Sequence, residues 1–114
     1  MTQHASLSPE RWARFDLGQQ ILQIGAEMQR ALKFLRTERS LELRACYERA
    51  LGLVDLTVQV QASSGLRREL LRWRGVVAEL YLRAEPDART HRQALRVLLR
   101  LHPESARQVA VLGL

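Results

Sequence analysis

The most informative polar side chains of this sequence are four arginines between residues 88 and 101. They follow one another at spacings of three, four and four residues, and they are Arg89, Arg92, Arg96 and Arg100. This spacing predicts one common face of a helix. No acidic residue occurs between Asp87 and Glu104 to neutralise that face. Because a guanidinium group stays charged and donates paired hydrogen bonds to phosphate oxygens, the pattern predicts nucleic-acid binding.

A second group of arginines precedes this one. It consists of Arg67, Arg68, Arg72 and Arg74. Only Glu69 and Glu79 offset its charge. Residues 63–114 carry ten basic and five acidic side chains, whereas residues 1–62 are nearly balanced with eight and seven. We therefore expect the nucleic-acid-binding residues among these eight arginines in the second half of the chain.

An arginine excess also arises without nucleic-acid binding. Seventeen of the eighteen basic residues are arginine, Lys33 is the only lysine, and the formal net charge is +6. A GC-rich genome encodes arginine in preference to lysine whatever the protein does. The same arginines also suit acidic side chains of a partner protein or of another subunit. A structural or protein-interaction oligomer is therefore the alternative function.

Residues that catalyse reactions or bind metals are sparse. The three histidines are His4, His91 and His102, and none is followed four residues later, on an inward helix face, by a second histidine or a carboxylate. Cys46 lies in an apolar stripe, where a thiol is usually a small core residue. The sequence has no glycine-rich phosphate loop. We therefore predict no catalytic residue, no metal and no cofactor, and we expect that the protein is not an enzyme.

Length and composition favour a single helical domain over residues 1–114. The 114 residues are 46% hydrophobic and only 5% aromatic, so the core has to be aliphatic. Six glycines and three prolines are too few for the many turns of a β-sandwich. Charges interrupt every apolar stretch, which argues against a membrane span. A single cysteine, and a start without signal-peptide features, predict a cytoplasmic protein.

Apolar residues at alternating spacings of four and three predict four helices, over about residues 9–36, 40–61, 65–83 and 87–101. We call the inward-facing apolar stripe of each predicted helix its seam. The seam of the first helix consists of Leu17, Ile21, Ile24, Met28, Ala31 and Leu35. The seam of the third consists of Leu66, Leu70, Trp73, Val77 and Leu80. The first helix begins either at Ser8 or near Asp16, and residues 104–114 form a tail with room for a short helical turn. Short connections predict an antiparallel up-down-up-down four-helix bundle.

Several residues are unusual for their places in these predicted helices and therefore indicate particular contacts. The glycines inside predicted helices favour close approach of helices or subunits, and they are Gly18, Gly25, Gly52 and Gly75. Asp55 stands in the most apolar stretch, so it needs an arginine partner, a hydrogen bond or exposure. Trp12, Phe15 and Trp73 are candidates for stacking on bases, but Trp73 belongs to a seam and is expected in the core.

The order of these features resembles a family of small bacterial four-helix bundles. The similar stretch comprises the apolar segment from Ala50 to Leu56, the polar turn near Ser63, and the segment from Leu70 to Trp73. The family includes the accessory variability determinant (Avd) of diversity-generating retroelements and the ribosomal intervening-sequence proteins. The resemblance covers about residues 15–101. It implies a basic homopentamer that binds structured RNA and a reverse transcriptase and has no enzymatic activity of its own.

Overall fold

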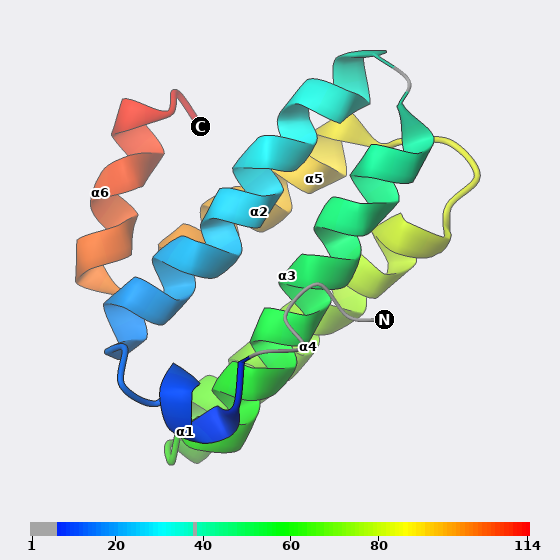
Figure 1. The fold of residues 1–114 in the computed structure, drawn as a ribbon. Coiled ribbons are helices and arrows are strands. Elements are labelled where there is room, and N and C mark those ends of the chain that lie inside the picture. Colours follow the sequence, from blue (N-terminus) through cyan, green and yellow to red (C-terminus); the bar gives the residue numbers. More distant parts are fainter. Residues whose placement is uncertain (1–6, 38) are drawn as a thin grey trace.

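Six helices make up the computed structural model, which describes residues 7–37 and 39–114 (Figure 1). The helices are α1 (Pro9–Trp12), α2 (Leu17–Thr37), α3 (Ser40–Val60), α4 (Ser64–Leu82), α5 (Ala88–Leu99) and α6 (Pro103–Val111). No strand occurs in the two described ranges, which confirms the all-α class. The expected number of four helices is wrong, because one predicted helix is divided and the predicted tail adds another. His4 and Glu38 lie outside the described residues.

The first predicted helix is divided at residues 13–16. Ser8 caps α1 by accepting a hydrogen bond from the Arg11 amide at 3.1 Å. α2 then begins with a capping box, in which the Asp16 and Gln19 side chains each accept from the other's backbone amide at 2.9 Å. Both alternative starting points are therefore used. The continuous helix over residues 9–36 is wrong because this cap replaces the helical hydrogen bonds across the division.

Trp12 explains why α1 exists as a separate short helix. Its indole is fully buried, and Nε1 donates to Thr57 Oγ1 of α3 at 2.9 Å. Gln20 of α2, also fully buried, donates from Nε2 to the carbonyls of Trp12 and Phe15 at 3.0 Å each. These bonds hold α1 near the start of α2 and the end of α3 (Figure 1).

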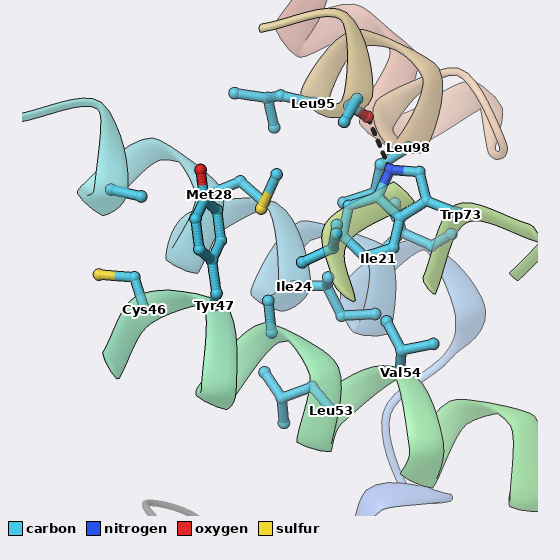
Figure 2. Close-up of a cluster of buried hydrophobic side chains, with 14 of the residues drawn as sticks. Ile21, Ile24, Met28, Cys46, Tyr47, Leu53, Val54, Trp73, Leu95 and Leu98 are labelled. Atoms are coloured by element: carbon cyan, nitrogen blue, oxygen red, sulfur yellow. Dashed lines mark hydrogen bonds between the residues drawn. The ribbon is translucent and has the colours of Figure 1, made fainter. Parts of the chain in front are cut away.

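The four longer helices contact one another in chain order. α2 packs against α3, α3 against α4, α4 against α5, and α5 returns to α2. The α2 seam faces this interior, where Ile21, Ile24 and Met28 are fully buried (Figure 2). Trp73 of α4 is buried as predicted, and its Nε1 donates to the Ala94 carbonyl of α5 at 2.7 Å. No helix in the described ranges has both the length and the apolar composition that crossing a lipid bilayer requires.

The predicted C-terminal tail is instead a helix of nine residues, α6, which packs on α2 and α5. His102 is its N-cap, because Nδ1 accepts a hydrogen bond from a backbone amide of the first turn at 3.1 Å. Ser105 is fully buried and donates to the Leu99 carbonyl of α5 at 2.7 Å. Val109 and Leu112 pack against the hydrophobic core. These contacts stabilise a longer helix than the sequence pattern predicts.

The glycines inside the helices are of two kinds. A Cβ atom on Gly18 would lie 2.9 Å from a ring nitrogen of the α6 N-cap, and one on Gly25 would lie 3.1 Å from Leu99 Cδ2. The predicted close approach is confirmed at these two positions. A Cβ atom on Gly52 or Gly75 would meet no atom of the described chain within 4 Å. The contacts within the chain therefore give no reason for glycine at either of them.

Alanine substitutions at Gly25 and Gly52 test this division. Gly52→Ala replaces a helical glycine at an open position, so the free energy of unfolding should rise by about 1 kcal/mol. Gly25→Ala gains the same helix propensity but forces a methyl group against buried Leu99. Such overpacking costs about 1–3 kcal/mol, so the free energy of unfolding should fall. Urea denaturation followed by circular dichroism measures both, and a rise for both variants would contradict a tight contact between α2 and α5.

Candidate nucleic-acid interface

Three arginines of α5 and its C-cap residue Arg100 share one face of that helix, which we call the arginine stripe (Arg89, Arg92, Arg96 and Arg100). Asp87 starts the helix by accepting a hydrogen bond from the Thr90 amide at 3.0 Å. The inward face carries His91, Leu95 and Leu98, which are buried. The two end members of the stripe are exposed, and the two middle members are half-buried beside the packed face. The position of α5 in the fold therefore leaves the stripe at the surface.

The arginine stripe has no acidic counterpart within the described chain. None of its four side chains makes an ion pair with another described residue. In addition, Nε of Arg96 is buried and has no hydrogen-bond acceptor in the described ranges. A buried donor without an acceptor is unfavourable by roughly 1–3 kcal/mol. The stripe thus combines unneutralised charge with one desolvated donor.

Arg74, one of the predicted α4 arginines, is engaged by another helix. Its Nε donates to Asp55 Oδ1 of α3 at 2.6 Å, and its Nη2 donates to Asp55 Oδ2 at 3.1 Å. The bond to Asp55 raises the pKa of Arg74. Asp55 is about half-exposed and paired, as the sequence requires of an acid in an apolar stretch. The pair is a structural contact between α3 and α4.

The other predicted arginines of α4 are exposed. Arg67 and Arg68 lie near the start of the helix, and neither forms an ion pair with a described residue. Arg72 pairs with Glu69 of the preceding turn at 3.1 Å. Both members of that pair are exposed, so their attraction contributes little to stability.

A groove of about 310 Å³ lies between α4 and α5 and separates the two groups of arginines. Its apolar lining consists of Trp73, Val76, Ala94, Val97 and Leu101. Arg72 is the one predicted arginine that also lines it. Val97 and Leu101, which line the groove, each follow a stripe residue by one position. Because one position in an α-helix is a rotation of about 100°, the stripe faces about 100° away from the groove. The eight predicted arginines therefore do not converge on one surface.

None of the three aromatic residues predicted as candidates for stacking presents an exposed ring on α5 in the described structure. Trp12 is fully buried, so its candidate role in stacking is wrong. Trp73 is 4% exposed, which confirms its place in the core. Phe15 is partly exposed, but it lies between α1 and α2 and contacts the edge of Trp12, with 5.6 Å between ring centroids.

His91 is the buried polar residue of α5, and both of its ring nitrogens have partners. Nε2 lies 2.7 Å from the Met28 carbonyl of α2, and Nδ1 lies 2.8 Å from the Tyr47 hydroxyl of α3. Because a carbonyl only accepts, Nε2 carries the proton, and Nδ1 accepts from the hydroxyl. Burial lowers the pKa of His91 and raises the pKa of Tyr47, so both groups are neutral. The network occupies both nitrogens and joins three helices.

A buried ion pair between α2 and α3 was not predicted from the sequence. Glu27 is 6% exposed, and both of its carboxylate oxygens accept from Arg49 Nε at 3.0 Å. Arg30 also pairs with Glu27. Cys46 beside them is buried as predicted, and burial raises the pKa of its thiol. The one feature of the sequence that indicates burial of Glu27 is its position directly before Met28, a residue of the α2 seam.

No group of three or more His, Cys, Asp and Glu side chains suited to a metal occurs among the described residues.

The network around His91 predicts a pH dependence of folding. Because the pKa of His91 is lowered in the folded protein, the unfolded chain takes up the proton first as the pH falls. The contribution of His91 to the free energy of unfolding is therefore complete above about pH 6.5 and decreases below it. The slope should approach about 1.4 kcal/mol per pH unit. Urea denaturation at about pH 7.5 and about pH 5.5 measures the decrease.

Two variants show whether His91 is the group responsible. His91→Gln lacks the titrating imidazole and should lose most of the decrease, at a lower absolute stability. His102→Gln is the matched control at the start of α6 and should keep the decrease. An undiminished decrease in His91→Gln would contradict the assignment.

The chain matches no family model, no curated protein and no solved structure.

Proposed function

We propose that this protein is a non-enzymatic nucleic-acid-binding protein and that its ligand is structured RNA. The proposed contact surface is the arginine stripe of α5. The observation that carries this proposal is the charge of the stripe, which has no ion-pair partner within the described chain. On other helices, Arg49 and Arg74 have acidic partners from neighbouring helices.

The arrangement of the stripe is unfavourable for the isolated chain and favourable for a phosphate ligand. Like charges one helical turn apart repel each other. RNA supplies a row of negative charges, and binding releases the counterions that surround them. Phosphate oxygens also accept hydrogen bonds from guanidinium groups, in pairs where the geometry allows.

We propose that the contacts are made to the RNA backbone rather than to the bases. Both tryptophans are buried, and the stripe itself contains only arginines. Contacts to phosphates orient a nucleic acid but carry little sequence information. Affinity should therefore depend strongly on salt and on the shape of the RNA, and weakly on its sequence.

We also propose that α2 to α5 form an antiparallel up-down-up-down four-helix bundle, with α1 and α6 as additions. Contacts between consecutive helices, and between α5 and α2, support this arrangement. A bundle would hold the arginine stripe on a rigid frame. The resemblance to Avd-like proteins implies a reverse-transcriptase partner, which remains a prediction, and five subunits, which compete with the dimer proposed below.

A salt series with a triple variant tests the proposal. The variant replaces Arg92, Arg96 and Arg100 by alanine and so removes three charges from the stripe. We expect wild-type affinity for a labelled structured RNA to fall steeply between about 50 mM and about 200 mM salt. In the variant, the slope of log K against log salt should decrease by about three units, about one for each phosphate that is no longer neutralised. Fluorescence anisotropy measures both slopes.

A second triple variant separates the stripe from total charge. It replaces Arg14, Arg39 and Arg44 by alanine, which removes the same charge from outside α4 and α5. This control should change the slope by less than about one unit. Equal effects of the two variants, or no binding by the wild type at about 50 mM salt, would overturn the proposal.

A further inference from the structure

Helix α4 carries a second apolar seam on the side away from its core seam. This outer seam follows spacings of four, three and four residues and consists of Leu71, Gly75, Ala78 and Leu82. Because an α-helix turns about 100° per residue, the centres of the two seams lie about 150° apart. The same alternation of four and three is the pattern by which helices pair in coiled coils.

Three of the four residues of the outer seam are exposed in the described chain, and Ala78 is half-buried. Leu71 is 51% exposed and Leu82 is 76% exposed. A Cβ atom on Gly75 would meet no described atom within 4 Å. α3 and α5 contact α4 on its other sides, through Arg74 and Trp73 among others. A glycine in a helix interior costs about 1 kcal/mol, and a second helix packed closely on this seam would explain why glycine stands there.

Charges beside the outer seam fit a second copy of the same helix. Arg68 and Arg72 flank its first half, and Glu79 flanks its second half on the same side. When two copies of α4 run antiparallel with Gly75 facing Gly75, Glu79 of each copy lies level with Leu71 of the other. It then lies within one turn of the other copy's Arg68 and Arg72. In a parallel pair, arginine would face arginine, and the two helices would repel each other.

Glu79 is available for this contact. It is exposed and forms no ion pair with any described residue. Among the described residues, Arg72 forms an ion pair only with Glu69 on the surface of the same helix, a contact that an incoming carboxylate can share. Two symmetric contacts between Arg72 and Glu79 would therefore flank the apolar seam.

We propose that the outer seam of α4 binds the same seam of a second copy of this chain, antiparallel and about a two-fold axis at Gly75. This interaction goes beyond the proposed RNA binding and does not use the arginine stripe of α5. A self-complementary face closes at two subunits, whereas a five-fold ring needs two different faces. One pair of helices buries an area at the small end of specific interfaces, so the dimer is weak and depends on concentration.

Sedimentation equilibrium without RNA, from low to high micromolar protein, tests the dimer. Wild type should pass from monomer to dimer. Gly75→Gln places a side chain on the two-fold axis and should stay monomeric, although its position is open in the single chain and its thermal stability should not fall. Leu71→Ser combined with Leu82→Ser should also abolish dimerisation. Leu41→Ser is the matched control, since Leu41 is 80% exposed at the start of α3, and this variant should dimerise normally.

Charge reversal tests the antiparallel register. Arg72→Glu and Glu79→Arg each turn two attractive contacts into repulsive ones, so each variant should weaken dimerisation by about tenfold. The double variant restores opposite charges and should recover wild-type dimerisation. A monomer at every concentration, a pentamer, or a dimer that the single reversals leave unchanged would overturn the proposal.

Discussion

The hydrogen bonds of His91 are the contact on which the geometry of this protein depends most. They join α5 to the Met28 carbonyl of α2 and to the Tyr47 hydroxyl of α3. Loss of the imidazole would leave the buried Tyr47 hydroxyl without its hydrogen-bond partner and would remove the bond from α5 to the Met28 carbonyl, which is costlier than losing a surface hydrogen bond. Because His91 faces the interior, the rotation of α5 about its own axis is set. The same rotation turns the arginine stripe away from the core.

The parts of the fold that could be predicted are those that depend on residues close together in the sequence. The seams of α2 and α4 are buried along most of their length as expected, with only their terminal residues half-buried, because alternating spacings of four and three residues belong to the helix itself. The division between α1 and α2 could not be predicted, since it depends on Trp12 reaching Thr57, 45 residues further along the chain. α6 has only nine residues, too few for a periodic pattern, and is held by contacts of Ser105 with α5 and of Val109 with the core.

The candidate site could be predicted only in part, for a related reason. Helical spacing indicates that the stripe arginines share a face, but it does not indicate which arginines have acidic partners. Arg74 and Asp55 are nineteen residues apart and meet only because α3 and α4 pack together. Glu27 and Arg49 likewise pair across α2 and α3. Residues of the outer seam of α4 repeat with the period of the core seam, so only the contacts distinguish the packed face from the open one.

Contact between the arginine stripe and RNA phosphates can be tested most directly by NMR of the arginine side chains. An isotope-labelled sample titrated with structured RNA reports each guanidinium group separately through its Nε–H resonance. We expect the resonances of Arg92, Arg96 and Arg100 to shift and their exchange with water to slow. The resonance of Arg74, bound to Asp55, should stay in place. Shifts confined to α4, or a spectrum that RNA leaves unchanged, would contradict RNA binding through α5.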